Sequence, residues 1–291
     1  MKGPLLLACN HPNSFLDAIL LDILFQKPIW SLARGDVFKK SFYVPLLTKL
    51  KILPVYRTSE GVENLTTNYK TFEECKNIFR NNGIVLMFSE GKCVNEWHLR
   101  PLKKGTARLA ISSWEQNINL QVLPVGINYS SFNRFGKNIF LNFGTIITAD
   151  EISSNDSDGK KHLDFNNRLQ DELTQLVFEI PDRDKLSQEE LLVIKPATLI
   201  KILLRIPSLL GLLLNSPLYL LIRYFVRAKA KGTDHYDSIM IALLVFFYPF
   251  YLLLVTFWLF IITHSYFSLL LLLILPFTAW SFVQIKQQLD K

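Results

Sequence analysis

The chain is organised around residues 10–17, which read Asn10-His11-Pro12-Asn13-Ser14-Phe15-Leu16-Asp17. An apolar run from Pro4 to Cys9 precedes them and predicts a strand with His11 just after its end. Pro12 predicts the start of a helix, because a first helical position has no intrahelical partner for the N–H that proline lacks. If His11 lies in the turn between strand and helix, its ring can fold back to reach Asp17. The stretch therefore predicts an imidazole oriented by a carboxylate, which suits a general base. A capped helix start with a hydrogen-bonded histidine is the simpler alternative.

Composition points to lipid rather than nucleic acid as the partner of this chain. Of its 291 residues 49% are hydrophobic, and the net charge is +7. The positive charge suits an anionic partner, either nucleic acid or lipid. The hydrophobic excess collects after Leu191, and especially after Ile239, in runs without charge, which favours lipid.

The three cysteines, Cys9, Cys75 and Cys93, have no paired spacing. They predict neither a disulfide framework nor a zinc site, and we interpret them as buried thiols in a reducing compartment. His98, His162 and His235 have no partners at ligand spacing, so we expect no metal and no bound cofactor.

Strand and helix patterns alternate through the first 180 residues, which predicts an α/β fold with a mostly parallel central sheet flanked by helices. The predicted strands are Leu5–Cys9, Ile29–Leu32, Ile52–Tyr56, Ile84–Phe88, Gln121–Ile127 and Ile139–Phe143. The clearest predicted helices are Ser14–Phe25, Val62–Arg80, Gly105–Trp114 and Asp164–Phe178. The polar stretch Ala149–Lys161 is interpreted as a surface loop.

Three further segments carry candidate binding residues. Residues 49–57 run from basic to apolar and end at Arg57, whose guanidinium is suited to phosphate. Residues 85–92 run from a strand into Ser89-Glu90-Gly91-Lys92, where glycine permits close backbone approach. Residues 99–110 place four cations around a helix start. Each segment also has an ordinary interpretation: a surface arginine, a strand-ending turn and a solvated helix face.

Together these segments resemble the glycerolipid acyltransferase family, which includes the glycerol-3-phosphate and 1-acylglycerol-3-phosphate acyltransferases. The matching pieces, in the family's order, are Asn10-His11…Asp17, Pro54…Arg57, Phe88-Ser89-Glu90-Gly91 and Val122-Leu123-Pro124-Val125. The resemblance covers roughly the first 145 residues. The later stretch Asp234-His235-Tyr236-Asp237-Ser238 is similar to a bacterial branch of the family.

The resemblance implies acyl transfer from acyl-CoA or acyl carrier protein, as co-substrate, to a lipid hydroxyl. It implies that His11 is the base and that Asp17 holds its ring. It further implies that Arg57 binds the acceptor phosphate, and that Glu90 and Gly91, with Lys92, complete the acceptor pocket.

The chain departs from the family pattern at three points. Five residues separate His11 from Asp17 where four are commonest, although the bacterial branch shares the longer spacing. Ser89 and Lys92-Cys93 replace the usual proline and Thr-Arg pair of the third motif. The glycine often found upstream of the second-motif arginine is missing.

The C-terminal part predicts a transmembrane helical hairpin. Residues 239–262 and 267–283 carry no charge and are long enough, the second marginally, to span a bilayer. Lys and Arg flank the two ends but not the connecting turn, which predicts both ends and the catalytic domain in the cytoplasm. Between Lys195 and Phe225 an apolar run is interrupted by Lys201, Arg205, Pro207 and Pro217, and we expect interfacial helices there. A core helix pair is the alternative.

The sequence thus predicts three parts: a catalytic domain at 1–185, amphipathic interfacial helices at 186–232 and a transmembrane hairpin at 233–291. It predicts a bacterial inner-membrane O-acyltransferase of phospholipid synthesis that acts on glycerol-3-phosphate or 1-acylglycerol-3-phosphate. An enzyme of the same fold acting on an aminolipid or another lysophospholipid is one alternative, and a non-catalytic membrane scaffold is another.

Overall fold

The computed structural model describes residues 3–38, 42–56, 65–152, 157–181, 183–286 and 288–289. The chain forms two compact units, Met1–Asn128 with Phe140–Asp182, and Tyr129–Ile139 with Arg183–Lys291. The second unit therefore includes the loop between two strands of the sheet as well as the C-terminal helices. The three-part division at 1–185, 186–232 and 233–291 stays a prediction.

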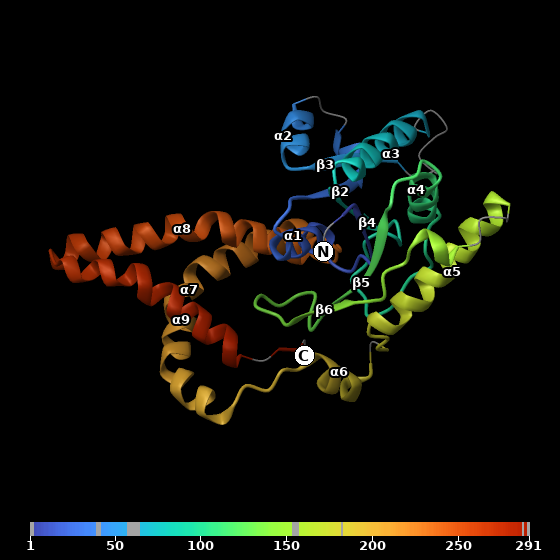
Figure 1. Ribbon diagram of the computed structural model, residues 1–291. Coiled ribbons are helices and arrows are strands. Elements are labelled where there is room, and N and C mark those ends of the chain that lie inside the picture. Colours follow the sequence, from blue (N-terminus) through green and yellow to red (C-terminus); the bar gives the residue numbers. More distant parts are fainter. Residues whose placement is uncertain are drawn as a thin grey trace. The chain divides into compact units, whose positions relative to one another are not determined.

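A six-stranded sheet with the order β3-β2-β4-β1-β5-β6 forms the centre of the first unit (Figure 1). The strands are β1 (Leu5–Cys9), β2 (Ile29–Arg34), β3 (Ile52–Val55), β4 (Ile84–Phe88), β5 (Gln121–Tyr129) and β6 (Ile139–Phe143). The pairs β1–β4, β1–β5, β2–β3 and β2–β4 are all parallel. The predicted α/β class with a mostly parallel sheet is confirmed.

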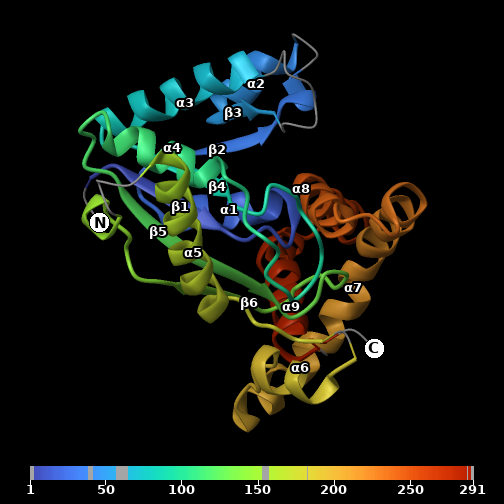
Figure 2. The same ribbon diagram turned by 90° about the vertical axis from the view of Figure 1, so that its right-hand side faces the viewer.

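Helices cover both faces of this sheet. Between the strands lie α1 (Ser14–Leu24), a 3-10 turn at Gly35–Phe38, α2 (Tyr43–Lys49), α3 (Leu65–Arg80) and α4 (Gly105–Trp114). A 3-10 turn at Ala149–Glu151 and α5 (Asp158–Leu176) follow β6. Figures 1 and 2 show α3, α4 and α5 on one face and α1 on the other. Alternate strand residues such as Leu6, Ala8, Val85 and Met87 belong to the core that includes α3, α4 and α5. This alternation places an apolar layer on each side of the parallel strands.

The first helix begins at Ser14, as its periodicity predicts, and not directly at Pro12. One predicted boundary was wrong. The fifth helix begins at Asp158, so the predicted loop at 149–161 ends earlier than expected. An acidic residue in the first turn suits the positive end of a helix, and polar composition had hidden this start.

The second unit is helical. It contains α6 (Lys185–Leu192), α7 (Thr198–Ala230), α8 (Tyr236–Thr263), a 3-10 turn at Tyr266–Leu270 and α9 (Leu271–Ile285). Within the described ranges, three segments are long and apolar enough to cross a membrane: Thr198–Ala230, Tyr236–Thr263 and Tyr266–Ile285. The sequence predicts interfacial helices between 195 and 225. The structure has one helix there, because α7 continues through Pro207 and Pro217, and its interfacial placement stays a prediction.

The end of α5 is held against β5 by side-chain amides. The Nδ2 atoms of Asn128 and Asn142 donate to the carbonyl oxygen of Leu176 over 3.0 and 2.8 Å. This satisfies a carbonyl at a helix end that has no intrahelical donor. The backbone comes close here, since a Cβ on Gly126 would lie 2.5 Å from the same Leu176 oxygen.

We predict that Gly126→Ala lowers the free energy of unfolding by about 1–3 kcal/mol, because an added methyl group in a packed contact forces backbone shifts. The matched control is Gly159→Ala in α5, where an added Cβ meets nothing within 4 Å. That change should be neutral or mildly stabilising, since alanine favours helix by up to about 1 kcal/mol. Thermal unfolding of the purified variants measures both, and equal stability of the two would contradict the close packing.

Candidate active site

Parallel pairing of β1 with β4 brings two sequence motifs together. Cys9 at the end of β1 lies opposite Phe88 at the end of β4. On the other side of β1, Asn10 accepts a hydrogen bond from Ile127 N over 2.8 Å and donates to Ile127 O over 3.0 Å. The amide of Asn10 thus replaces a peptide group and holds the chain in line as it leaves the sheet. His11 and Glu90 consequently emerge from neighbouring strands at the same edge of the sheet, where ligands of such folds bind.

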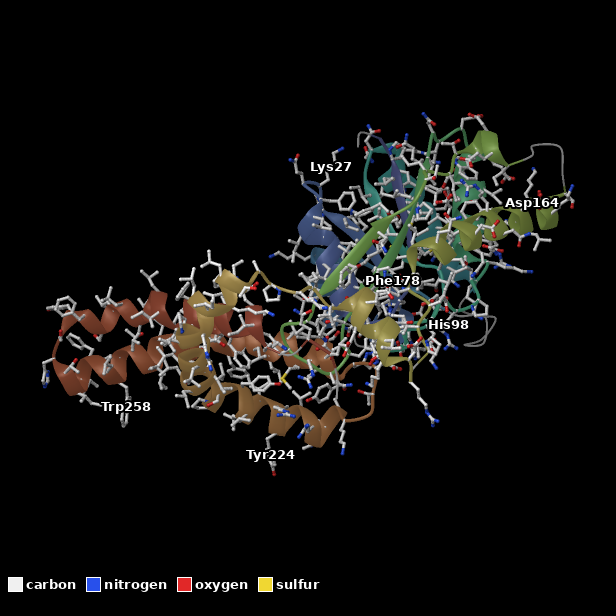
Figure 3. All side chains as sticks on the ribbon, turned by 90° about the horizontal axis from the view of Figure 1, so that it is seen from below. Lys27, His98, Asp164, Phe178, Tyr224 and Trp258 are labelled. Atoms are coloured by element: carbon white, nitrogen blue, oxygen red, sulfur yellow. The ribbon has the colours of Figure 1, made fainter. Side chains whose placement is uncertain are left out.

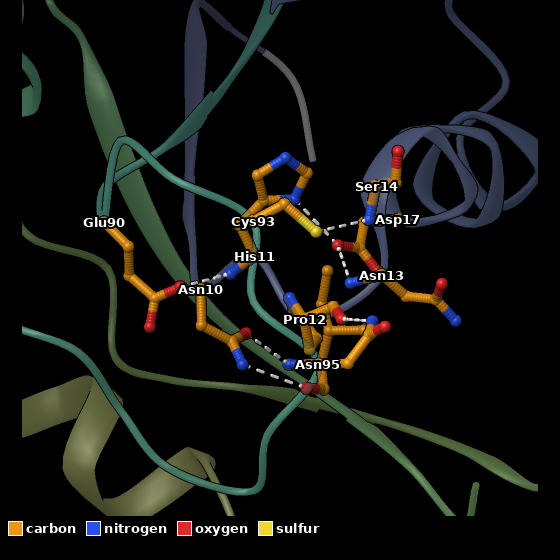
Figure 4. Close-up of polar contacts among 10 residues, drawn as sticks. Asn10, His11, Pro12, Asn13, Ser14, Asp17, Glu90, Cys93 and Asn95 are labelled. Carbon is orange, nitrogen blue, oxygen red and sulfur yellow. Dashed lines mark hydrogen bonds and ion pairs between the residues drawn. The ribbon is translucent and has the colours of Figure 1, made fainter. Parts of the chain in front are cut away.

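His11 and Asp17 form the predicted pair (Figure 4). His11 Nδ1 lies 2.8 Å from Asp17 Oδ2, and the same oxygen accepts the N–H of Asn13 over 2.8 Å. Asp17 is fully buried, whereas the His11 side chain is 18% exposed. The imidazole also stacks on the ring of Phe88, with centroids 3.8 Å apart and planes 9° from parallel. Nδ1 is therefore engaged with Asp17, and Nε2 is the nitrogen left for a substrate.

The turn between β1 and α1, residues 10–14, is called the histidine turn here and has an unusual backbone conformation. Ser14 has a φ of 51°, in the left-handed region that residues other than glycine rarely adopt. Its N–H donates to Cys93 Sγ over 2.9 Å. Such backbone strain is concentrated at functional sites in proteins. Here it lets the helix begin directly after the histidine turn.

Glu90 holds two backbone segments at once. Its Oε2 accepts the N–H of His11 over 2.7 Å, and its Oε1 accepts the N–H of Arg100 over 2.9 Å. Burial raises the pKa of the Glu90 carboxyl, while these two hydrogen bonds and the nearby His11 oppose that rise. The carboxylate is 5% exposed, so its place in the structure is beneath the histidine turn rather than in open solvent.

The loop after Glu90 contacts the histidine turn at further points. Val94 N donates to His11 O over 3.2 Å, and Asn95 Nδ2 donates to Pro12 O over 2.6 Å. Sequence reasoning missed Asn95, which belongs to no recognisable motif, and it named Phe88 in the third motif without predicting the stacking on His11. It also treated Cys93 as a buried thiol, whereas Cys93 is half-buried and accepts a hydrogen bond.

The six predicted site residues fall into three groups. His11, Asp17, Glu90 and Gly91 come together at the ends of β1 and β4, and Gly91 makes the turn with a φ of 65°. Lys92 follows at an exposed position. Arg57 lies outside the described residues. In the part of the chain that the structure describes, no group of three or more His, Cys, Asp or Glu side chains could hold a metal ion.

A comparison with protein families matches residues 1–128 to the family described as Acyltransferase. Residues 1–128 are thus similar to this family, and the match ends where the first segment of the first unit ends. A comparison with curated proteins gave no match to this chain. The family implies an acyl donor and an acceptor as substrates.

We predict that Glu90→Gln destabilises the site, because an amide has one acceptor atom for two facing N–H groups. One buried donor then loses its partner, at a cost of about 1–3 kcal/mol. The matched control is Glu96→Gln in the same loop, which removes only the partly exposed ion pair with Arg100 and should cost about 0–1 kcal/mol. Thermal unfolding and acyl-transfer assays measure the effect. Equal behaviour of the two variants would contradict the role of Glu90 as a double acceptor.

Proposed function

We propose that this protein transfers a fatty acyl group from acyl-CoA or acyl carrier protein to a hydroxyl of glycerol-3-phosphate or 1-acylglycerol-3-phosphate. The observation that carries the proposal is the hydrogen bond of 2.8 Å between His11 Nδ1 and Asp17 Oδ2. With Nδ1 bonded to a carboxylate, Nε2 can take a proton from a substrate hydroxyl. The acyltransferase match over residues 1–128 supports the reaction class.

The proposed reaction needs no acyl-enzyme intermediate, since a thioester is already activated. His11 Nε2 accepts the hydroxyl proton as the oxygen attacks the thioester carbonyl carbon. The tetrahedral intermediate then collapses, the carbon–sulfur bond breaks, and the departing thiolate takes the proton from His11. Asp17 holds the ring in one orientation and stabilises its charged form. The N-terminus of α1, directly after the histidine turn, favours the developing oxyanion.

The proposed acceptor depends on residues beyond the pair. Arg57, Glu90, Gly91 and Lys92 are proposed to bind the phosphate-bearing acceptor, as the family resemblance implies. Gly91 lies directly after the carboxylate that carries the His11 turn, so a ligand at this edge would reach both motifs. Acceptors of other kinds, an aminolipid or another lysophospholipid, are outcomes that the tests below distinguish.

The apolar helices support a membrane location for the proposed reaction. Their outer surfaces include exposed large side chains such as Phe250, Phe257 and Trp258 in α8. Monomeric soluble proteins rarely expose apolar surface of this extent. We propose an integral membrane protein, with the catalytic domain in the cytoplasm of a bacterial cell. This places the enzyme at the bilayer that holds its lipid substrate or product.

We predict that His11→Ala lowers acyl transfer by about 10²–10⁴-fold, the usual contribution of a positioned general base. The matched control is His98→Ala, since His98 is also paired with a carboxylate, Glu179, but is 62% exposed. The assay follows labelled acyl-CoA into lipid extracts with a panel of acceptors. Undiminished transfer by the His11 variant, with normal thermal unfolding, would remove His11 as the base.

We predict that Arg57→Ala raises the KM for a phosphorylated acceptor about tenfold or more, because a hydrogen bond between charged groups contributes about 1.5–3 kcal/mol. A neutral acceptor such as a monoacylglycerol should show no such change. Arg34→Ala is the control, since the Arg34 side chain is exposed and pairs with Asp36. An unchanged KM for glycerol-3-phosphate and for 1-acylglycerol-3-phosphate would point to the alternative acceptors.

A further inference from the structure

Three helical segments of the second unit are long and apolar enough to cross a membrane. Several of their ends are joined to one another by hydrogen bonds and ion pairs. Residues before α7, at the start of α8 and after α9 share hydrogen bonds or ion pairs with one loop, residues 130–138. This loop connects β5 to β6 and carries polar side chains, including the exposed Asn133. These contacts restrict how often the chain can cross a bilayer between them.

Gln288, after α9, is bonded to the segment before α7. Its Nε2 donates to Ile194 O over 2.6 Å, and its Oε1 accepts Ile194 N over 2.8 Å. The Nδ2 of Asn138 in the loop also donates to Gln288 Oε1, over 2.5 Å, and to Leu192 O, over 3.0 Å. The entrance to α7 and the exit from α9 therefore lie on the same side as the loop.

An ion pair fixes the start of α8 to the same loop. Lys137 pairs with Asp237 in the first turn of α8, and the two side chains are 2% and 1% exposed. Breaking a buried ion pair is strongly destabilising. Since Lys137 and Asn138 are neighbours in sequence, the start of α8 lies on the same side as Ile194 and Gln288.

Chain length then excludes a crossing by α7. Residues 194–198 can extend about 14 Å and residues 230–236 about 21 Å. A crossing helix would need one of these linkers to return through about 30 Å of hydrocarbon. We propose that α7 is a re-entrant helix, which enters the bilayer and leaves it on one face while α8 and α9 cross as a hairpin. The partner of its outer surface is the lipid of that leaflet.

Side chains satisfy the backbone at the middle of α7, as a bend inside hydrocarbon requires. Pro217 lacks the N–H that would bond to Leu213 O, and Ser216 Oγ donates to that oxygen over 3.0 Å. Two residues earlier, the carbonyl oxygen of Gly211 accepts a hydrogen bond from Asn215 Nδ2 over 3.0 Å. Figures 1 and 3 show the two halves of α7 running in different directions. Proline with freed carbonyls is an established cause of such a bend.

Two tyrosines near the middle of α8 form hydrogen bonds with the bend of α7. Tyr251 OH donates to Leu214 O over 2.5 Å, and Tyr248 OH donates to Asn215 Oδ1 over 3.3 Å. Tyr248 lies about 18 Å along α8 from Tyr236 at 1.5 Å per residue, near the middle of a bilayer core of about 30 Å. In the proposed arrangement α8 crosses the bilayer, so the bend of α7 lies near the middle of the bilayer.

The positions of the charged residues in α7 favour two short half-helices on either side of the bend, here called arms, over one membrane-spanning helix. Lys201 and Arg205 lie in its first turns, and Arg223 and Arg227 in its last turns. Residues 206–222 between them carry no charge. Halved at the bend, they form two arms that each rise about 13 Å, less than half of an apolar core of about 30 Å. The cations of both arms thus reach the headgroups of one leaflet.

The outer surface of α7 is apolar and uncovered. Leu203, Ile206, Leu209 and Leu213 are between 59% and 73% exposed. Figure 3 shows Tyr224 of α7 and Trp258 of α8 pointing away from the neighbouring helices. Inside the bilayer these side chains contact acyl chains, so the exposure costs nothing.

The test is labelling of single introduced cysteines by a membrane-impermeant maleimide in sealed vesicles of the full chain. Lys195→Cys and Lys231→Cys flank α7 at exposed lysines, and Tyr266→Cys lies in the turn between α8 and α9. We expect the first two to react from one side and the third from the other. The unchanged chain gives the background of Cys9, Cys75 and Cys93. Labelling of positions 195 and 231 from opposite sides, or of all three from one side, would overturn the proposal.

A depth measurement separates a re-entrant helix from one lying on the surface. Spin labels at Leu213→Cys and Phe250→Cys, which occupy the middles of α7 and α8, should show similar high oxygen access. A label at Leu199→Cys, in the first turn of α7, should show high access to a water-soluble nickel complex. If the label at position 213 behaves like the one at position 199, α7 does not enter the bilayer and the proposal fails.

Discussion

The parallel pairing of β1 with β4 is the constraint on which the candidate active site depends. Their register places Cys9 opposite Phe88, so the histidine turn and the Glu90 turn leave the sheet side by side. A slip of one residue would reverse the faces of every side chain in β1 and move His11 N away from Glu90. The apolar layers on both faces oppose such a slip, since β1 is buried along its whole length. Core packing therefore sets the geometry of the polar site.

Asp17 shows how buried hydrogen-bond donors maintain this geometry. Its Oδ2 accepts both a ring nitrogen of His11 and the N–H of Asn13, and its side chain is fully buried. A buried carboxylate is costly unless such donors compensate it. The fold therefore stabilises the ring orientation and the helix start together. Removing His11 takes away one of these donors, so stability and chemistry are coupled at this residue.

The sheet was predictable because its signals are local. The ranges Leu5–Cys9, Ile84–Phe88 and Ile139–Phe143 coincide with the observed strands, since short apolar runs between turn residues are read directly from the chain. The pairing of His11 with Asp17 was accessible for the same reason. The contact of Asn95 with Pro12 was not, because it depends on the course of a loop without periodicity. The continuity of α7 was also missed. Ser216 and Asn215 bond carbonyls of the preceding turn, and Tyr251, which is distant in sequence, bonds Leu214 O.

Side-chain amides resolve the same physical problem in both units. Asn10 bonds both backbone groups of Ile127, and Gln288 does the same for Ile194. An amide carries one donor group and one acceptor, as a peptide does, so it can pair a backbone N–H and C=O where an element ends. A carboxylate offers acceptors alone, which suits Glu90 beneath two N–H groups. The choice between amide and carboxylate thus follows from which backbone groups the fold leaves unpaired, and this is a tertiary property that local sequence does not encode.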